Sequence, residues 1–321
     1  MPANCRVSLP STKRPQRGVA VIMAMLTVAL VAAIAASVVA SFGFAVESLS
    51  GRHDLAQARW LARGAVDWAR NVLADDARTT SDVDHLGETW AVKVPPTPVD
   101  EGEVSGDIED LSGRFNLNNL AWNGAADEDA IKQFAKLLEL SGETPQDAKA
   151  KSIILARWLD VDLEDASAYP PGADGAPAPQ PLNQALVSVD ELAGVPGFNA
   201  AMLERLRPFV TALPTQQGRT LINVNTASAE VLSATIDNVS LDRARAMVSS
   251  RSTAWFKNIE DFNARQNLTL DPSRFACKSI YFLAAGRAHF GGATTRMQVL
   301  LARGANPNNG NWPEIIWQKI L

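Results

Sequence analysis

The sequence predicts an α+β fold, in which a long N-terminal helix lies on a small antiparallel sheet and a large helical domain interrupts that sheet. Three observations predict it. An uncharged run from Val19 to Val46 continues into residues with helical spacing. Strand-like patterns occur before residue 111 and again after residue 275. The residues between these strands have helical patterns, so a sheet with a helical insertion is the simplest architecture.

The composition indicates a folded and mildly acidic protein. Of the 321 residues, 46% are hydrophobic and 20% are charged, and this apolar content excludes a disordered chain. Two cysteines exclude a disulfide scaffold. The formal net charge of −5 argues against a general nucleic-acid binder, which needs a basic face. The length suits about two domains, or one domain with a large insertion.

The N-terminus has the charge pattern of a membrane-inserted segment. Residues 1–18 carry four basic side chains and no acidic one, and no charge occurs again until Glu47. As a helix, the uncharged run would span roughly 42 Å, whereas a bilayer core needs about 20 apolar residues. Basic residues before the run predict a cytoplasmic N-terminus and a body on the outer side of the membrane.

Three interpretations of this segment compete. A cleaved secretory signal has an apolar core of about 7–15 residues; the run here is longer, although the small residues Ala35 and Ala36 keep that option open. A plain signal anchor is the second interpretation. The third interpretation is a short basic leader that ends at Gly18. A peptidase that cuts there would remove the leader and leave the apolar helix intact.

The residues around Gly18 favour the third interpretation. Residues 16–23 (QRGVAVIM) resemble the cleavage site of type IV pilins and pseudopilins. The resemblance implies that a prepilin peptidase cuts between Gly18 and Val19 and methylates Val19. Losing the leader would change the net charge from −5 to −9 and leave Cys277 without an intramolecular partner.

Two positions depart from the usual pilin pattern. Val19 stands where phenylalanine is usual, and Met23 stands at the fifth mature position, where most members have glutamate. The resemblance implies that this glutamate neutralises the N-terminal amine of the neighbouring subunit. Such a partner is needed because an unpaired buried charge is costly. A subunit at the filament tip accepts no subunit above it, so Met23 points to a tip position.

Beyond the membrane segment we expect one helix from Val19 to about Ala74. Its apolar stripe is formed by Leu61, Ala65, Trp68 and Val72. A membrane anchor followed by an unrelated surface helix would give the same pattern. Alternation then predicts strands over residues 88–94, ended by prolines, and over 103–109, and further strands over 280–285, 296–302 and 315–321.

Helices are expected from about Asp127 and over residues 145–159, followed by a Pro- and Gly-rich loop over 170–181. Two helix-hairpin-helix-like units follow, and Asn225 or Thr226 is expected to cap a helix in the second. DNA binding by such a turn needs nearby basic residues. The first turn instead follows Asp190 and Glu191, so a packing unit is favoured.

Several ordered motifs narrow the resemblance. They are DLSGRFNLNNL (110–120), WLDVD (158–162), SVDEL (188–192) and INVNTA (222–227). Together with the leader and Met23, they resemble the minor pseudopilin K family of type II secretion systems. The resemblance implies a filament-tip subunit that binds the minor pseudopilins I and J, and also H and the major pseudopilin, and that is processed by prepilin peptidase in the bacterial inner membrane. Its body would be periplasmic, and no nucleic-acid partner is expected.

The predicted organisation is a leader (1–18), the transmembrane half of the helix (19–46), a pilin-like part with the helix end and first strands (47–110), an inserted helical domain (111–275) and C-terminal strands (276–321). A minor pilin of another type IV filament, such as a DNA-uptake pilus, is the alternative. An anchored periplasmic enzyme is a third class.

The search for catalytic chemistry gives no local motif. The three histidines lack metal-ligand spacing, and no phosphate loop or nucleophile elbow is present, so no enzymatic activity is expected. Oxygen ligands at alternate positions suit calcium, and one acidic cluster offers them, although it fails the EF-hand pattern; a solvated acidic loop is the competing interpretation. Its members are Asp160, Asp162, Glu164 and Asp165.

Asparagines and tryptophans are assigned structural roles. Asparagine side chains bond the local backbone in turns and caps, and core packing is the default for tryptophans on helix faces. The residues concerned are Asn116, Asn118, Asn223, Asn225, Trp60, Trp68 and Trp158.

Overall fold

A computed structural model of the chain describes residues 17–79, 82–122, 125–160, 183–215, 218–304 and 312–321. It divides into two compact units, residues 1–57 and 58–321. The mixed helix and antiparallel sheet architecture confirms the predicted fold class.

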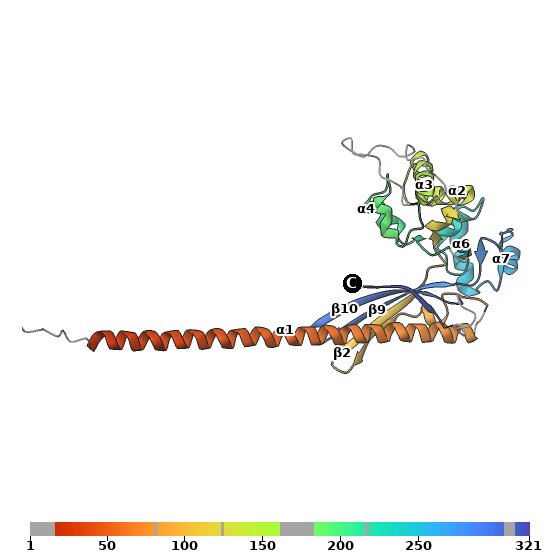
Figure 1. The fold of residues 1–321 in the computed structure, drawn as a ribbon. Coiled ribbons are helices and arrows are strands. Elements are labelled where there is room, and N and C mark those ends of the chain that lie inside the picture. Colours follow the sequence, from red (N-terminus) through yellow and green to blue (C-terminus); the bar gives the residue numbers. More distant parts are fainter. Residues whose placement is uncertain (1–16, 80–81, 123–124, 161–182, 216–217, 305–311) are drawn as a thin grey trace, which may run out of the picture. The chain divides into compact units, whose positions relative to one another are not determined.

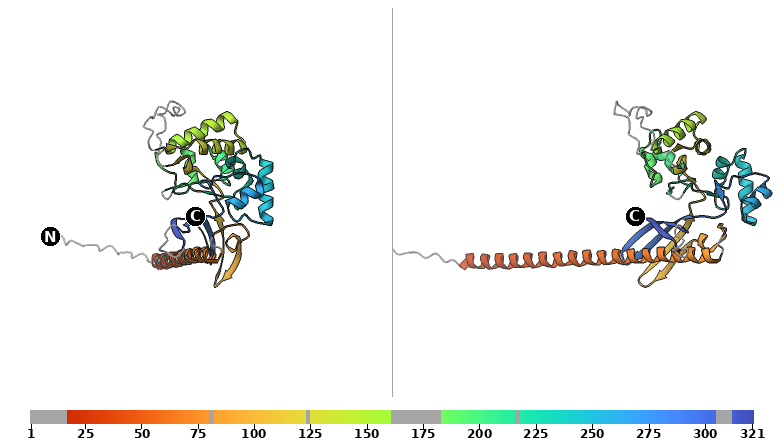
Figure 2. Two further views of the ribbon diagram at one scale, coloured as in Figure 1. Left: turned by 90° about the vertical axis from the view of Figure 1, so that its right-hand side faces the viewer. Right: turned by 45° about the vertical axis from the view of Figure 1, so that its right-hand side comes forward.

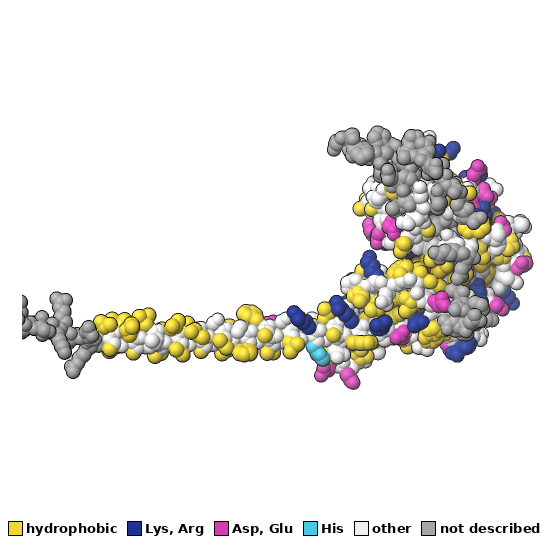
Figure 3. Space-filling model, in the orientation of Figure 1, with side chains coloured by type: hydrophobic (Ala, Val, Ile, Leu, Met, Phe, Trp, Pro, Cys, Tyr) yellow, Lys and Arg dark blue, Asp and Glu magenta, His cyan; other side chains and the backbone are white. Residues whose placement is uncertain are grey.

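The first unit consists, in its described part, of the N-terminal portion of helix α1 (Arg17–Thr79). Its apolar side chains are exposed, as Val19 and Val39 illustrate with 62% and 71% exposure. Figure 3 shows hydrophobic side chains along this part of α1. One window of α1 reaches a mean hydropathy of 2.7 with none of it buried, so the helix is long and apolar enough to cross a membrane.

The second unit is built around a five-stranded antiparallel sheet with strand order β1-β2-β9-β10-β11 (Figure 1). In the sheet, β2 pairs with β9 although the two strands are far apart in the sequence, and Ile108 lies opposite Ala284. The strand bounds are β1 (Val94–Val99), β2 (Gly102–Asp110), β9 (Tyr281–Phe290), β10 (Ala293–Ala302) and β11 (Glu314–Ile320).

The C-terminal part of α1 packs against this sheet (Figures 1 and 2). Ala62, Val66 and Leu73 share a buried cluster with Phe282 of β9. The approach is close at Gly286, where an added Cβ would lie 3.5 Å from the Ala62 carbonyl oxygen. Small residues on the facing surfaces therefore bring the helix backbone near the sheet.

The first strand differs from the sequence prediction. Residues 89–91 form a short 3-10 helix, and β1 begins only at Val94 and includes the prolines expected to end it. This is tolerated because β1 is an edge strand that pairs with β2 alone, so the missing proline N–H groups cost no ladder bonds on the outer side. Trp90, which contributed to the misleading alternation, is instead buried within the hydrophobic core between α1 and the sheet.

The residues between β2 and β9 are mainly helical and share one large hydrophobic core. Asp127 caps the first of the α-helices and Thr144 caps the second, which begins with Pro145. The described helices are η2 (Leu117–Leu120), α2 (Glu128–Leu140), α3 (Pro145–Leu159), η5 (Val189–Gly194), α4 (Ala200–Leu206), α5 (Ala229–Thr235), α6 (Leu241–Thr253) and α7 (Ile259–Gln266).

Short strand pairs tie this helical block together. They are β3 (Phe115–Asn116) with β6 (Val210–Thr211), β4 (Ala121–Trp122) with β5 (Ala125–Ala126), and β7 (Ile222–Asn223) with β8 (Phe275–Ala276). The predicted caps of α5 were wrong: Ser228, not Asn225 or Thr226, accepts the hydrogen bond from Val231 N. Asn225 does not cap α5, because its side-chain amide donates to the Phe256 carbonyl oxygen and accepts from Phe256 N.

Candidate functional site

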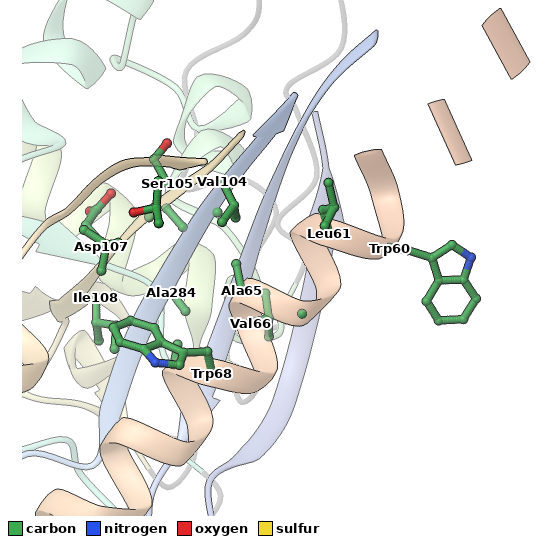
Figure 4. Close-up of a pocket in the computed structure, with 17 residues that line it drawn as sticks. Trp60, Leu61, Ala65, Val66, Trp68, Val104, Ser105, Asp107, Ile108 and Ala284 are labelled. Atoms are coloured by element: carbon green, nitrogen blue, oxygen red, sulfur yellow. The ribbon is translucent and has the colours of Figure 1, made fainter. Parts of the chain in front are cut away.

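An apolar groove lies beside α1 in the second unit (Figure 4). It has a cavity volume of about 490 Å³. Trp60 and Trp68 of α1 line it together with Val104 and Ile108 of β2 and Ala284 of β9. The Trp60 indole projects away from the strands. A hollow of this kind between a helix and a sheet offers a place for apolar side chains of another molecule.

The groove exists because the buried face of α1 is narrow and made of small residues. That face consists of Ala58, Ala62, Val66, Ala69, Leu73 and Ala77. The predicted stripe lies beside it: Leu61, Ala65 and Val72 are only half-buried. The core-packing prediction is wrong for two tryptophans, since Trp60 is 67% and Trp68 49% exposed. It holds for Trp158, which is buried.

The residues predicted for leader processing lie at the start of α1. Gly18 and Val19 are in its first turn and exposed, and Met23 is 61% exposed on the same helix. A Cβ at Gly18 would meet nothing within 4 Å. The cleavage, the methylation and the role of Met23 stay predictions.

The acidic cluster predicted for calcium is described only at its first member. Asp160 is the C-cap of α3 and is buried. Asp162, Glu164 and Asp165 lie outside the described residues, as do the leader up to Gln16 and the loop over 170–181. Whether the cluster binds calcium stays a prediction.

The four signature asparagines have structural roles, as predicted. Asn118 donates to the Leu186 and Leu213 carbonyl oxygens at 2.9 Å each and accepts from Leu186 N at 2.8 Å. Asn116 donates to Leu213 O and to the Thr220 hydroxyl. Each of the four is nearly inaccessible to solvent, so these amides stabilise the segments they join.

A buried polar junction connects the sheet to the helical block, and sequence reasoning missed it. Asp110 at the end of β2 accepts hydrogen bonds from Ser112 N at 2.7 Å, the Ser279 hydroxyl at 2.6 Å and the Thr226 hydroxyl at 2.5 Å. Asn223 Nδ2 adds a bond to Ser279 Oγ at 2.7 Å. Burial raises the pKa of Asp110 to about 6, while the hydrogen bonds from Ser279, Thr226 and Ser112 oppose that rise.

In the first hairpin unit, the arginines Arg205 and Arg207 are each paired with a carboxylate. In the first unit, Ser188 and Glu191 form a capping box on η5. Arg207 pairs with Asp190 at 2.9 Å and with Glu204 at 3.0 Å. These pairs hold the pKa of Asp190 below its usual range, chiefly through the hydrogen bond from Arg207. A guanidinium engaged by two carboxylates is a poor phosphate ligand.

Comparisons with known proteins agree with this architecture. Models of the family "Type II secretion system (T2SS), protein K" match residues 113–215 and 222–274. Type II secretion system protein K of Pseudomonas aeruginosa is 35% identical over 265 residues, covering 78% of this chain and 77% of that protein. The Aeromonas hydrophila protein K is 29% identical over 320 residues, covering 92% and 95%.

A solved structure shows the same fold. It is the GspK–GspI–GspJ complex from enterotoxigenic Escherichia coli, in which one chain matches with a TM-score of 0.70 and 22% identity, covering 86% of this chain and 99% of that one. The resemblance predicted from the motifs is confirmed by the relatives named above. The chain therefore belongs to the type II secretion system protein K family.

Proposed function

We propose that this chain is a non-enzymatic minor pseudopilin at the tip of the type II secretion pseudopilus. There it binds the minor pseudopilins I and J, helps to initiate the filament and supports export of folded proteins across the outer membrane. The support is family membership, together with a fold like that of a protein crystallised with GspI and GspJ. Contacts with pseudopilin H and the major pseudopilin belong to the same proposal.

The groove beside α1 is the observation that carries the proposal. Exposed tryptophans in an apolar hollow are costly for a monomer and are typical of residues that dominate binding energy at interfaces. Trp60 and Trp68 lie on the helix that continues the apolar N-terminal segment. A partner with its own long helix could follow α1 and fill the groove, which is how pilin-like subunits would associate.

The tip position rests on Met23 and on the helical block. An uncharged side chain at the fifth mature position offers no partner for the amine of an incoming subunit. The block over residues 111–275 would make the tip broader than a filament of simple pilin folds. In this proposal the N-terminus is cytoplasmic, α1 crosses the inner membrane once and the body is periplasmic.

Processing and metal binding complete the proposal. Prepilin peptidase cuts after Gly18 and methylates Val19. The acidic cluster Asp160, Asp162, Glu164 and Asp165 binds calcium through its hard oxygen ligands. The proposal includes a division of the chain into a leader (1–18), a transmembrane half of the helix (19–46), a pilin-like part (47–110), an inserted helical domain (111–275) and C-terminal strands (276–321).

Co-purification of the full-length chain with pseudopilins I and J tests the proposal. We expect Trp68→Ala to weaken recovery of the partners about tenfold or more, as loss of an interface tryptophan does. Trp255→Ala is the matched control, because Trp255 is equally exposed, at 49%, but lies outside the groove. Equal recovery with both variants would remove the groove from the interface.

Other outcomes would favour the alternatives. Failure of the wild-type chain to recover I or J contradicts the tip role. Salt-sensitive DNA binding would instead support a DNA-uptake pilin. Hydrolytic or transfer activity that survives removal of the partners would support an anchored enzyme.

A further inference from the structure

A pocket lies between the segment that follows α1 and the end of helix α6. Its cavity volume is about 320 Å³, which is within the size range of sites for small ligands. His85 and Leu86 line it from the first segment, Arg251 from the last turn of α6, and Trp255 from the residues after α6. The pocket shares no lining residue with the groove beside α1, so the two are separate sites.

Arg251 brings a buried positive charge to this pocket. The residue is 8% exposed, and its Nη1 donates to the Val224 carbonyl oxygen at 2.6 Å. Within the described residues this is the only hydrogen bond of its side chain, and no carboxylate forms an ion pair with it. Burial lowers the pKa of Arg251 to about 10, and no neighbouring acid opposes that effect.

The charge of Arg251 is only partly compensated by the protein. A carbonyl oxygen and the partial negative charge at the C-terminal end of a helix offset a fraction of one positive charge. A buried ion without a counter-ion is costly, and the guanidinium has further N–H groups for which the described chain offers no acceptor. Because Arg251 lines the pocket, an anion bound there would supply both the charge and the acceptors, and a carboxylate accepts two parallel N–H bonds from an arginine.

Trp255 forms a flat apolar wall of the same pocket. Its indole stacks on the His85 ring, with 4.0 Å between the ring centroids and an angle of 14° between the planes. His85 covers one face of the indole, yet Trp255 is 49% exposed. The other face is therefore open to a ligand, and flat unsaturated groups stack favourably on such a face.

Hydrogen bonds fix the backbone that carries Trp255. The Asn225 amide donates to the Phe256 carbonyl oxygen and accepts from Phe256 N, both at 2.9 Å. Arg265 donates to the carbonyl oxygens of Ala254 at 2.9 Å and of Trp255 at 3.2 Å. The wall is thus in place before any ligand arrives, and a preorganised site loses less entropy on binding.

We propose that this pocket binds a carboxylate carried on a flat apolar group, with Arg251 holding the carboxylate and Trp255 stacking on the group. Among the described lining residues Arg251 is the only lysine or arginine, whereas a nucleic-acid backbone presents rows of phosphates that need several cations. An inorganic anion would pair with Arg251 but would leave the indole face uncovered. The carboxylate can belong to a free aromatic acid or to an acidic residue beside an aromatic one in a peptide, since both have this chemistry.

Saturation-transfer NMR on the protons of small probes tests the proposal with the full chain in detergent. Benzoate is the probe for a free acid, and the acetylated and amidated dipeptide Phe-Glu is the probe for a peptide. Benzamide and the corresponding Phe-Gln dipeptide have the same shapes without the charge. We expect saturable binding of at least one acid, and binding of its neutral counterpart that is about tenfold weaker or more, because a hydrogen bond between two charged groups is lost. The acid that binds more tightly identifies the source of the carboxylate.

Variants of the arginine locate the carboxylate. Arg251→Met removes the charge and should weaken binding of the acid about tenfold or more. Arg251→Lys keeps a charge without the planar fork, so it should weaken binding less. Arg243→Met is the matched control, because Arg243 lies on the same helix and also donates to a carbonyl oxygen, that of Gln266, but is exposed and does not line the pocket.

Variants of the tryptophan locate the flat group. Trp255→Ala removes the wall and should weaken binding of the acid about fivefold or more, since a stacked aromatic pair is lost. Trp255→Phe keeps a flat ring and should weaken binding less than Trp255→Ala does. Because Trp255 is exposed, both variants should fold, and they test the proposal even if Arg251→Met does not fold.

Two results would overturn the proposal. One is that neither acid binds the wild-type chain more tightly than its neutral counterpart does. The other is that Trp255→Ala binds the acid as the wild type does. Trp255→Ala is expected to recover pseudopilins I and J normally, so failure of this inference is distinguishable from failure of the tip role. Circular dichroism checks that each variant is folded.

Discussion

At the scale of single residues, buried acidic side chains affect the stability of this protein more than its mild net charge indicates. Asp110 lies at the junction of the sheet and the helical block and is surrounded by hydroxyl and amide donors. Those donors stabilise the ionised carboxylate, whereas burial destabilises it. The balance makes the junction sensitive to pH.

We expect the wild-type protein to be more stable at pH 5 than at pH 7, and Asp110→Asn to lose most of this difference. The folded-state pKa of Asp110 is about 6, against an ordinary value of 3.8. The folded protein thus holds the proton more tightly, and the stability from protonation is lost as the pH rises through about 4 to 6. Between pH 7 and pH 5 the protein gains about one pH unit of this shift, which corresponds to about 1.4 kcal/mol.

Thermal unfolding midpoints at pH 5 and pH 7 measure this effect. Asp107→Asn serves as the control, since Asp107 is exposed on the same strand. A midpoint difference that is unchanged in Asp110→Asn would show that another group titrates.

A second residue-scale prediction concerns Gly18. We expect Gly18→Val to block removal of residues 1–18, because a peptidase that needs glycine on the leader side cannot place a branched side chain there. Gly43→Val is the control: it lies in the same helix, and at both positions an added Cβ meets nothing within 4 Å. The mass of the purified chain reports cleavage, and a mature mass for Gly18→Val would contradict the predicted site.

At the scale of elements, α1 divides its side chains by size. Alanines and a few larger residues face the sheet, whereas tryptophans face outward. Helical spacing alone predicted an apolar stripe, but several apolar rows run along this helix. Packing against a glycine-containing strand selected the row with the smallest side chains.

This division predicts a large loss of stability from one truncation on α1 and a small change from another. Leu73→Ala should lower the free energy of unfolding by about 2–5 kcal/mol, because Leu73 is fully buried and leaves a cavity. Trp60→Ala should change it by less than about 0.5 kcal/mol, since Trp60 is mostly exposed. Denaturant unfolding of both variants checks this, and comparable losses would place Trp60 in the core.

Elements with local signals were predictable. The helix α3 begins at Pro145 behind the Thr144 cap, and its predicted bounds agree with the structure. The strand β1 was not predictable, because only its place at the sheet edge permits its prolines. The groove was not predictable either. Which apolar side chains of α1 stay exposed, Trp60 and Trp68 among them, depends on which row of the helix packs against the sheet.

The polar clusters were hidden for a different reason. Arg303 and Asp76 are 227 positions apart, so no spacing in the sequence could indicate that they meet. The asparagine roles were predictable because they follow from the chemistry of the side chain, although the particular partners, such as Leu186 for Asn118, were not.

At the scale of the whole molecule, the helical block enters and leaves the sheet at one place. Asp110 at the end of β2 lies opposite Phe282 near the start of β9. Leu111 N donates to Tyr281 O at 2.9 Å. Chain ends this close together allow an inserted domain to be removed without separating the strands.

We therefore expect a chain in which residues 112–279 are replaced by four Gly/Ser residues to keep the sheet folded on α1. Asp110→Ser is included, because the carboxylate would otherwise lose its donors. A cooperative thermal transition and strand-type circular dichroism are the expected results. A non-cooperative melt would show that the sheet needs the block, and the equivalent deletion without Asp110→Ser should be the less stable of the two.

The pairing of β2 with β9 also has a consequence for how the chain folds. Asp110 and Ser279 are 169 positions apart yet hydrogen-bonded, so the central sheet is made of contacts with high contact order, which form slowly. During synthesis, β2 would emerge long before its partner strand, whereas the whole helical block would already have emerged before β9 does. Once folded, the block would hold the ends of β2 and β9 together and so reduce the loop-closure entropy that opposes their pairing.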